Sequence, residues 1–323
     1  MPLLLREADV QALLTMPLAL EAVEESFRRQ AAGEAILHPR RRLEVPEKSF
    51  LHYMAAADTA SGFLGMKLYT SVRGALRFLV PLYVAKTGEL AALVEADFLG
   101  QMRTGAASGV ATKYLAREDA RSVGIVGTGL QARTQLEAVA AVRRVQALRA
   151  FGRDPERREN FCREMSARLG LRVAPAGSAE QAVRDADIVV AATTASKPVV
   201  QGEWLAPGAH INAIGANFPQ KRELDDAAVN RADLVAVDSK EQSQLEAGDL
   251  IQAFAGDAAR WAAVRELAEI VSGKAAGRTG ARQITLFKSN GIATWDVAVA
   301  ARVYALARER GMGQRIQMWG DAE

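Results

Sequence analysis

SVGIVGTGLQA, residues 122–132, is the stretch that decides the fold of this chain. Its apolar run, residues 123–126, leads into Gly127-Thr128-Gly129-Leu130-Gln131-Ala132, which has the pattern G-x-G-x-x-A. In a strand–turn–helix unit Gly127 permits the tight turn, Gly129 lets the backbone approach a pyrophosphate, and the small Ala132 lets the helix pack on the strand. The free N–H groups of the helix N-terminus would then bind the phosphates. The stretch predicts a dinucleotide site containing Gly127, Gly129, Leu130 and Gln131, with a plain strand–helix turn as the alternative.

Strands and helices alternate after this motif. Apolar runs predict strands near residues 122–127, 147–152, 171–175, 187–192, 210–215 and 233–238. Ser178 and Gln181 have the spacing of a capping box that opens a helix over residues 178–186. This alternation is typical of a parallel sheet, and we expect an α/β fold with a Rossmann dinucleotide-binding domain over residues 118–296.

The residues before the motif have a different pattern. We expect a short strand at residues 3–5 and a helix from an N-cap at Thr15, with Pro17 in its first turn, to Gly33. Strands are expected at residues 41–45, 49–54, 63–70, 75–84 and 90–95, followed by a helix over residues 101–115 that is rich in small residues. A long amphipathic helix, residues 292–310, is expected to return to this part. The predicted second domain is therefore a discontinuous α+β domain, residues 1–117 with 297–323.

Composition excludes several classes of protein. The chain has 323 residues, a net charge of +3, one cysteine and three histidines, so we expect about two domains, no disulfide framework and no metal centre. We expect no signal peptide, because the apolar run at the N-terminus is too short and meets Glu7 and Asp9 at once. We expect no membrane segment, because no apolar run approaches the roughly 20 residues that span a bilayer, and we expect a cytoplasmic location. Arg40-Arg41-Arg42 is too short, and lacks the interleaved aromatic residues, to bind nucleic acid. An anionic small molecule suits this cluster better.

Several stretches match one family in order along nearly the whole chain: His38-Pro39-Arg40-Arg41, Gly65-Met66-Lys67, Met102-Arg103-Thr104-Gly105-Ala106, residues 127–132, Ala192-Thr193-Thr194, residues 214–219 with Lys221, Glu223 and Leu224, and Gly291 with Asp296. The chain resembles the ornithine cyclodeaminase/mu-crystallin family, which includes an archaeal alanine dehydrogenase and ketimine or pyrroline-2-carboxylate reductases. The resemblance implies a homodimer whose first domains share a β-structure. It also implies that residues 1–117 with 297–323 form the substrate-binding and dimerisation domain.

The same resemblance implies roles for individual residues. Lys67 would face the nicotinamide and bind the substrate carboxylate or exchange a proton with the imine nitrogen or a water; a plain surface lysine is the alternative. Arg103 would clamp the α-carboxylate with its guanidinium fork. Arg41 would be a second carboxylate contact, although its neighbours Arg40 and Arg42 leave the position open by one residue. Thr104 would reach the cofactor phosphates.

The expected cofactor is NADP(H), with NAD(H) as the alternative. The second strand of the Rossmann pattern ends Phe151-Gly152-Arg153-Asp154, so Gly152 stands where NAD-binding folds usually have a carboxylate. Arg153 would suit a 2′-phosphate, whereas the nearby Asp154 keeps NAD(H) open. Thr193, Thr194 and Gly215 are also expected to line the cofactor. Ser289 and Gly291, which precede the last helix, would touch the nicotinamide, with a structural turn as the alternative.

Two departures from the family pattern bear on the reaction. Asn217 stands where ornithine cyclodeaminase has an aspartate, and His52 stands where it has a glutamate. An amide cannot act as a general base, and both changes remove negative charge that would hold a second ammonium group. We therefore predict an NAD(P)H-dependent reductase of a small α-imino acid, a cyclic ketimine such as pyrroline-2-carboxylate or piperideine-2-carboxylate, giving L-proline or pipecolate. Ornithine cyclodeaminase, alanine dehydrogenase and a non-catalytic NADPH-binding protein are the alternatives.

Overall fold

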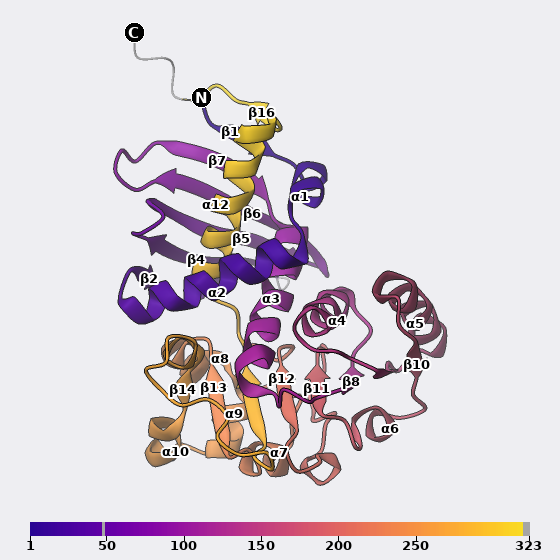
Figure 1. The fold of residues 1–323 in the computed structure, drawn as a ribbon. Coiled ribbons are helices and arrows are strands. Elements are labelled where there is room, and N and C mark those ends of the chain that lie inside the picture. Colours follow the sequence, from indigo (N-terminus) through magenta and orange to yellow (C-terminus); the bar gives the residue numbers. More distant parts are fainter. Residues whose placement is uncertain (47–48, 319–323) are drawn as a thin grey trace. The chain divides into compact units, whose positions relative to one another are not determined.

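The chain divides into two compact units. The computed structural model describes residues 1–46 and 49–318. Unit 1 comprises Met1–Arg103 and Gly291–Glu323, and unit 2 comprises Thr104–Asn290; Figure 1 shows the elements of each. The division falls inside a helix, between Arg103 and Thr104, whereas the sequence pattern predicts a domain boundary after that helix, at residue 117.

Unit 1 is built on an eight-stranded sheet. The strands run in the order β16-β1-β7-β6-β5-β4-β2, and β3 pairs with β4. All pairings are antiparallel except that of β1 with β7, so the expected mostly antiparallel α+β unit is confirmed. The strands are β1 (Leu3–Leu5), β2 (Ala35–Leu37), β3 (Arg41–Val45), β4 (Ser49–Asp58), β5 (Phe63–Val72), β6 (Ala75–Val84), β7 (Leu90–Glu95) and β16 (Gln314–Arg315).

The helices of unit 1 are α1 (Glu7–Leu13), α2 (Met16–Ala32), α12 (Ala293–Arg310) and the first turns of α3 (Asp97–Leu115). Thr15 caps α2 by accepting a hydrogen bond from the Leu18 N–H, and Gly33 ends this helix in the left-handed conformation at φ 77°, which glycine adopts without strain. Helix α12 packs against α2, β4 and β5. Its Trp295 meets Phe27 of α2 edge to face, with ring centroids 5.3 Å apart, and this contact anchors α12 in the core.

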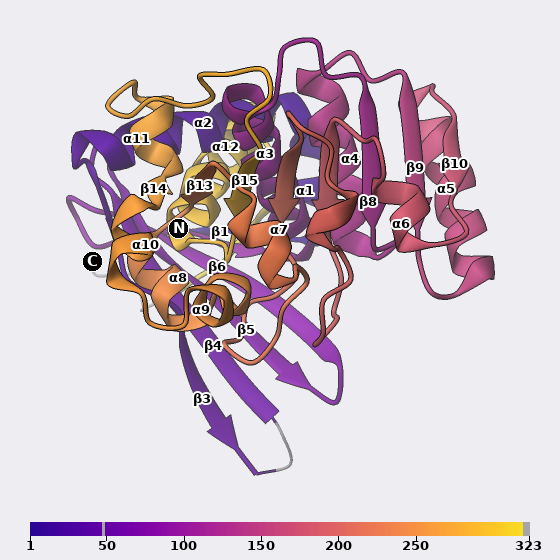
Figure 2. The same cartoon turned by 90° about the horizontal axis from the view of Figure 1, so that it is seen from below.

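The long strands of unit 1 have two unlike faces, because side chains alternate along a strand. Figure 2 shows these strands, β3 to β5, extending side by side. One face carries Met54 and Lys67, which are buried and paired across β4 and β5. The other face carries large apolar side chains that are exposed: Ile36, Leu43, Val45, Leu51, Tyr53, Leu64 and Val72.

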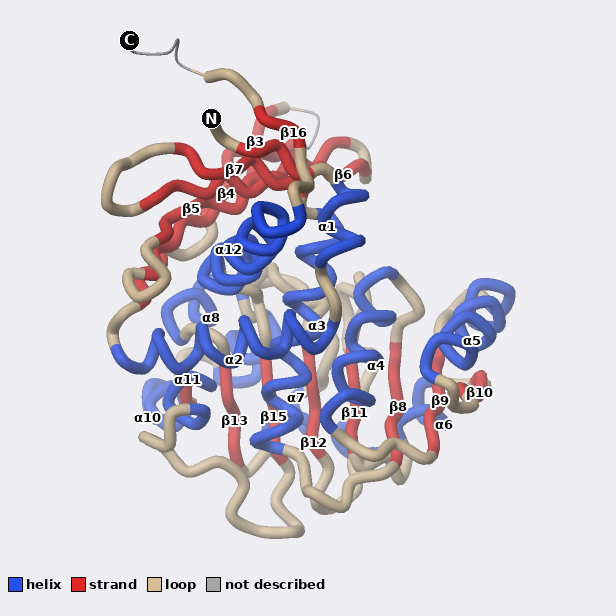
Figure 3. The backbone as a smooth tube through the Cα atoms, turned by 45° about the horizontal axis from the view of Figure 1, so that its top comes forward, coloured by secondary structure: helices blue, strands red, loops and turns tan. Residues whose placement is uncertain are grey.

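Unit 2 is an all-parallel, eight-stranded sheet. The strand order is β10-β9-β8-β11-β12-β15-β13-β14, and Figure 3 shows most of these strands side by side. The strands are β8 (Ser122–Val126), β9 (Ala147–Phe151), β10 (Val173–Pro175), β11 (Ile188–Ala191), β12 (His210–Ala213), β13 (Leu234–Val237), β14 (Arg265–Glu266) and β15 (Thr285–Lys288). The chain order reverses between β8 and β11, which is the switch point where ligands bind in folds of this kind.

Apolar cores lie on both faces of this sheet. Ile188 and Val190 join one core with α4 and α5, whereas Val189 and Ala191 join the other with α6, α7 and α9. The helices are α4 (Leu130–Val142), α5 (Pro155–Leu169), α6 (Ala179–Val183), α7 (Asp226–Asn230), α8 (Lys240–Glu246), α9 (Gly248–Phe254), α10 (Ala258–Ala263) and α11 (Leu267–Val271), with a 3₁₀ turn at Gly202–Trp204. A parallel sheet with helices and apolar cores on both faces is the Rossmann-type doubly wound fold expected from the sequence.

No helix in the described part of the chain is long and apolar enough to cross a membrane.

The structure corrects three details. Helix α3 begins at Asp97 rather than at residue 101, so Arg103 and Thr104 lie inside the helix rather than at its start. Strand β15 was not expected; it inserts between β12 and β13, and its four buried residues give no alternation to detect. The capping box is only half formed, because Ser178 accepts from the Gln181 N–H while the Gln181 side chain accepts from Gly177 rather than from Ser178.

Candidate functional site

The glycine turn of unit 2 leaves an open cradle at the start of α4. Gly127 has φ +115°, and a Cβ there would collide with the carbonyl oxygen of Ala192. Gly129 is the N-cap of α4, has no side-chain cap, and has nothing within 4 Å of where a Cβ would be. Within the described residues the buried Oε1 of Gln131 has no hydrogen-bond partner. Uncapped N–H groups, a backbone without a Cβ and an unpaired polar atom together fit a bound pyrophosphate.

The end of β9 presents cationic side chains. Arg153 is exposed directly after the buried Gly152, and Arg158 donates to the Gly152 carbonyl at 3.1 Å. Asp154 caps α5 by accepting from the Arg157 N–H at 3.0 Å. The carboxylate nearest to this strand end therefore already has a structural hydrogen bond.

The small residues of α3 serve close packing within unit 2. A Cβ on Gly105 would collide with the backbone carbonyl of Thr134 in α4. Gln135 of α4 donates to the Thr104 carbonyl at 3.1 Å. These contacts show that the small residues let α3 and α4 pack closely, and Thr104 is buried.

Unit 1 contains a buried cluster of charges around Asp296. Its Oδ1 atom lies 3.1 Å from Lys67 Nζ and 3.1 Å from Arg103 Nε, with all three side chains buried. Each residue comes from a different element: Lys67 from β5, Arg103 from α3 and Asp296 from α12. Gly100 leaves room for the ammonium group, since a Cβ there would be 3.1 Å from Lys67 Nζ.

Arg40 and Gly291 complete this cluster. Arg40 is buried and its Nη2 donates to the Gly291 carbonyl at 3.4 Å. Gly291 has φ +78°, and a Cβ there would be 2.6 Å from Arg103 Nη1. Only glycine satisfies both the backbone conformation and the approach of Arg103. Gly291, expected at the cofactor, therefore lies between two arginines of unit 1.

Cations outnumber carboxylates in this cluster among the residues that the structure describes. Lys67 and Arg103 share the Asp296 carboxylate, and the charge of Arg40 also acts on Lys67. The pKa of Lys67 is lowered from 10.5 to about 8: burial has the largest lowering effect, the charges of Arg103 and Arg40 add to it, and Asp296 opposes them. The second oxygen of Asp296, Oδ2, is buried and has no hydrogen-bond partner within the described residues. A buried excess of positive charge is suited to bind an anion such as a substrate carboxylate.

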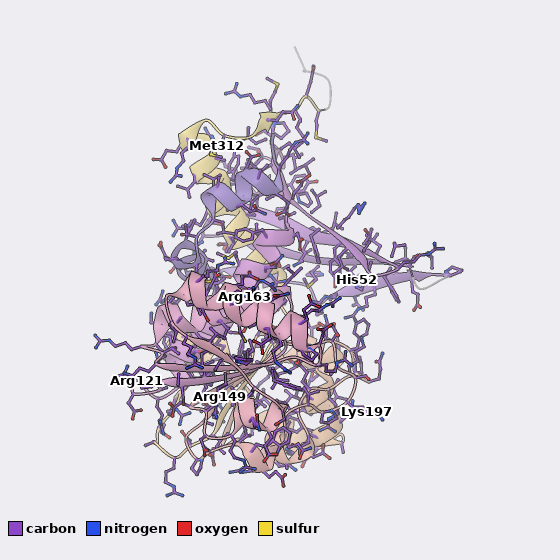
Figure 4. All side chains as sticks on the ribbon, turned by 90° about the vertical axis from the view of Figure 1, so that its right-hand side faces the viewer. His52, Arg121, Arg149, Arg163, Lys197 and Met312 are labelled. Atoms are coloured by element: carbon purple, nitrogen blue, oxygen red, sulfur yellow. The ribbon has the colours of Figure 1, made fainter. Side chains whose placement is uncertain are left out.

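His52 lies on the same sheet face as Lys67. It pairs with Tyr69, which is two residues along β5 from Lys67. Its ring stacks on Tyr69 at 4.2 Å between centroids, and Tyr69 stacks on Phe78. Figure 4 labels His52 on the long strands. Burial lowers the pKa of His52 to about 4, helped by the charges of Arg42 and Arg40, so the ring is neutral near pH 7. Within the described residues its buried Nδ1 has no partner.

The remaining predicted residues of unit 2 lie in loops at the carboxyl ends of its strands. Thr193, after β11, donates from both its N–H and its hydroxyl to Glu223. Gly215, after β12, donates its N–H to the same carboxylate. Ser289 donates to Asp238 at 3.1 Å. Thr194 is exposed, and Asn217 is half-buried in the loop after β12.

Arg41 is the predicted residue that the structure separates from the others. It is exposed on β3, whereas its neighbour Arg40 is buried against Gly291. The sequence pattern predicts no role for Asp296, although its Oδ1 atom lies 3.1 Å from both Lys67 Nζ and Arg103 Nε. The sequence feature that could have pointed to Asp296 is its place as a single acidic residue in an otherwise apolar stretch of α12. A carboxylate buried in such a stretch needs a partner of opposite charge.

Unit 2 has the architecture of a dinucleotide-binding domain, with the glycine turn at the switch point of its sheet. A family model described as the ornithine cyclodeaminase/mu-crystallin family matches residues 1–311. The chain belongs to this family.

Similar proteins include reductases and a dehydrogenase. The chain is 40% identical over 262 residues to Delta(1)-pyrroline-2-carboxylate reductase of Bacillus cereus, covering 79% of this chain and 80% of that protein. It is similar to the structure of Delta(1)-pyrroline-2-carboxylate reductase of Thermococcus litoralis in complex with NADH and L-proline, with a TM-score of 0.93, 39% identity and coverage of 97% and 100% of the two chains. It is also similar to an archaeal alanine dehydrogenase dimer with bound NAD, with a TM-score of 0.92, 34% identity and coverage of 98% and 99%.

Proposed function

We propose that this chain is an NAD(P)H-dependent reductase of a small cyclic imino acid such as pyrroline-2-carboxylate, forming L-proline. The observation that carries this proposal is the buried, net-positive cluster of Lys67, Arg103, Arg40 and Asp296. It is combined with a glycine turn that fits a pyrophosphate. The enzyme class expected from the sequence is also the class of the similar reductases.

The two arginines of the cluster would hold the substrate carboxylate. Arg103 and Arg40 are both buried, so their attraction for an anion is weakened little by water. We assign the second contact to Arg40 instead of the expected Arg41, because Arg41 is exposed. Asp296 would hold Lys67 and Arg103 in place through its Oδ1 atom.

Lys67 would supply the proton that the reaction consumes. Reduction of a C=N bond adds a hydride to carbon and a proton to nitrogen, and a bound NAD(P)H supplies the hydride. A lysine with a pKa of about 8 is largely protonated at pH 7 and still gives up its proton readily. Protonation makes the imine more electrophilic, so an acid at this position serves the reaction better than a nucleophile.

The cofactor would lie along the carboxyl ends of the strands of unit 2. Gly127, Gly129, Leu130 and Gln131 would hold the pyrophosphate, and Thr193, Thr194 and Gly215 would line the nicotinamide end. We propose a preference for NADP(H) over NAD(H), because Arg153 is exposed at the end of β9 while Asp154 caps α5. The similar structures are described with NADH or NAD, so the comparison supports a nicotinamide cofactor in general.

Cyclodeamination is disfavoured by the residue types at three positions, His52 and Asp296 of unit 1 and Asn217 of unit 2. Ornithine carries a second ammonium group, which needs negative charge to bind in a buried site. His52 is neutral, and Asn217 stands where a base would be needed. Asp296 is already shared by two cations.

The exposed apolar face of unit 1 supports a homodimer. Its side chains include Leu43 of β3 and Leu51 and Tyr53 of β4, and the latter two alternate along β4 with the buried His52 and Met54. Patches of this kind on a sheet mark an association surface, and one similar structure is a dimer. Leu43→Glu is expected to give a monomer in analytical ultracentrifugation; a variant that sedimented as the wild type would contradict this surface.

The proposed function is tested by following reduced-nicotinamide absorbance with pyrroline-2-carboxylate as substrate. We expect rapid oxidation of NADPH, a slower reaction with NADH, and formation of proline. Lys67→Ala is expected to abolish turnover and to bind NADPH with unchanged affinity. Oxidation with pyruvate plus ammonia alone would make the chain an alanine dehydrogenase, and proline from ornithine without net cofactor use would make it a cyclodeaminase.

A further inference from the structure

Unit 2 contains a second buried cluster of charges, which the proposed chemistry does not use. Glu223, Asp249 and Lys288 are each 0% exposed. Glu223 lies in the segment after β12, Asp249 in α9, and Lys288 at the end of β15. Burying three charges is costly, and a cluster of apolar side chains would often stabilise a fold as well or better. The arrangement therefore calls for a reason beyond stability.

The Glu223 carboxylate joins two loops. Its Oε1 accepts from the Thr193 N–H at 2.6 Å and from the Thr193 hydroxyl at 2.7 Å, and its Oε2 accepts from the Gly215 N–H at 2.6 Å. The Thr193 hydroxyl in turn accepts from the Ala195 N–H at 3.1 Å. One side chain thus holds the loop after β11 against the loop after β12, and each donor has a defined direction.

Asp249 binds the backbone at Glu223, and Lys288 binds both Asp249 and the loop after β12. Asp249 Oδ1 accepts from the backbone N–H groups of Glu223 and Leu224 at 2.6 and 2.8 Å. Asp249 Oδ2 is paired with Lys288 Nζ at 3.1 Å. Lys288 Nζ donates to the Ala216 carbonyl at 2.6 Å, so the loop after β12 is held at Gly215 by an anion and at Ala216 by a cation.

Close packing leaves these loops little freedom to shift. A Cβ on Gly215 would lie 2.5 Å from Glu223 Oε1, and a Cβ on Gly248 would lie 2.6 Å from the Phe218 carbonyl. In open parallel sheets, ligands bind at loops that follow the carboxyl ends of the strands. The loops held by Glu223 are of this kind.

We propose that Glu223, with Asp249 and Lys288 behind it, is a positioning residue that fixes the loops after β11 and β12 in the conformation that binds the nicotinamide end of the cofactor. This inference rests on the proposed function, since it names the device that prepares the same cofactor site. Glu223 acts through Thr193 and Gly215 and does not itself need to touch the cofactor.

The test compares Glu223→Gln with Asp187→Asn. Asp187 is a matched control, because its carboxylate also accepts two backbone N–H groups and a hydroxyl, from Arg121 and Ser122. It lies at the amino end of β11, the edge of the sheet opposite to the proposed cofactor loops. In Glu223→Gln an amide NH₂ replaces one carboxylate oxygen, so one of the two loops loses its acceptor.

Two measurements are made on each full-length variant. NADPH and NADH affinities are determined by fluorescence titration, and hydrogen exchange is measured on peptides covering residues 192–196 and 213–219 without cofactor. Glu223→Gln is expected to weaken cofactor binding about tenfold or more and to speed exchange in these two peptides. Asp187→Asn is expected to lower the melting temperature, with cofactor affinity within about twofold of the wild type.

The outcomes separate this inference from the proposed function. Equal cofactor affinity in Glu223→Gln and the wild type would overturn the inference, as would equal losses of affinity in both variants. A wild type that binds NADPH but reduces no imino acid contradicts only the proposed substrate, while a wild type that binds neither cofactor contradicts the proposed function itself. Should Glu223→Gln fail to fold, Thr193→Val removes one of the three donors and is expected to weaken binding in the same direction by a smaller factor, whereas unchanged affinity in this variant would overturn the inference.

Discussion

Removing the negative charge of Asp296 should change the pH dependence of the reaction. In Asp296→Asn the side chain keeps its size and one oxygen acceptor, while the charge 3.1 Å from Lys67 Nζ disappears. Asp296 raises the pKa of Lys67, opposing the effects of burial and of the Arg103 charge. The substitution therefore lowers that pKa further below about 8.

The size of the shift can be bounded from the distance. Two unit charges 3.1 Å apart attract each other by about 1.3 kcal/mol even at the dielectric constant of bulk water, and more in a buried site. This energy corresponds to about one pKa unit as a minimum. Lys67 would then titrate at about 7 or lower, and its protonated fraction at pH 8 would fall from about one half to about one tenth.

The assay is kcat/KM for pyrroline-2-carboxylate between pH 5.5 and 9. The wild type is expected to lose activity as the pH rises through about 8. Asp296→Asn should lose it at least about one unit earlier, with a deficit of about fivefold or more at pH 8 relative to pH 6. Asp58→Asn is the matched control, because Asp58 is also buried in unit 1 but pairs with Arg29 at 2.6 Å. If the alkaline limb of Asp296→Asn coincided with that of the wild type, Lys67 would not be the proton donor whose pKa Asp296 sets.

Four other substitutions test the two sites. Gly129→Val should lower the free energy of unfolding by less than about 1 kcal/mol, since nothing lies within 4 Å of where the new Cβ would be. It should still bind NADPH at least about tenfold more weakly, because the added side chain would block the approach of the pyrophosphate. Normal NADPH affinity in a titration would contradict the pyrophosphate site. Arg40→Ala should raise KM for the imino acid by about tenfold or more while the exposed Arg41→Ala changes it less than about twofold, and the reverse result in steady-state kinetics would restore Arg41 as the carboxylate contact. Arg153→Ser should lower kcat/KM with NADPH about tenfold and leave NADH nearly unchanged, whereas equal effects on both cofactors would remove the argument for a 2′-phosphate contact.

The fold could be predicted largely from local signals. The glycine turn, the N-cap at Thr15 and the alternation in the first strands each act over a few residues, so their meaning survives without tertiary context. Strand β15 could not be predicted in this way. Its segment is short and wholly buried, and its place between β12 and β13 depends on how the sheet is wound.

The choice among Arg40, Arg41 and Arg42 shows how far the site could be predicted from the sequence. Adjacent residues at the start of a strand point to opposite faces, and a shift of one residue exchanges the buried position for the exposed one. The sequence pattern of three arginines contains no signal for that choice. The contact of Arg40 with the Gly291 carbonyl shows that Arg40 lies buried at the cluster, and these two residues are 251 positions apart.

The sequence by itself determined the class of fold, the glycine turn for a dinucleotide and the presence of Lys67 and Arg103, because turn chemistry and periodicity are local properties. Only the tertiary structure decided which charges meet. Asp296 joins Lys67 and Arg103 from a helix far along the chain, and Glu223 joins the loops after β11 and β12. Both arrangements depend on burial and distance, which determine pKa values and ion pairs and which no short stretch of sequence contains.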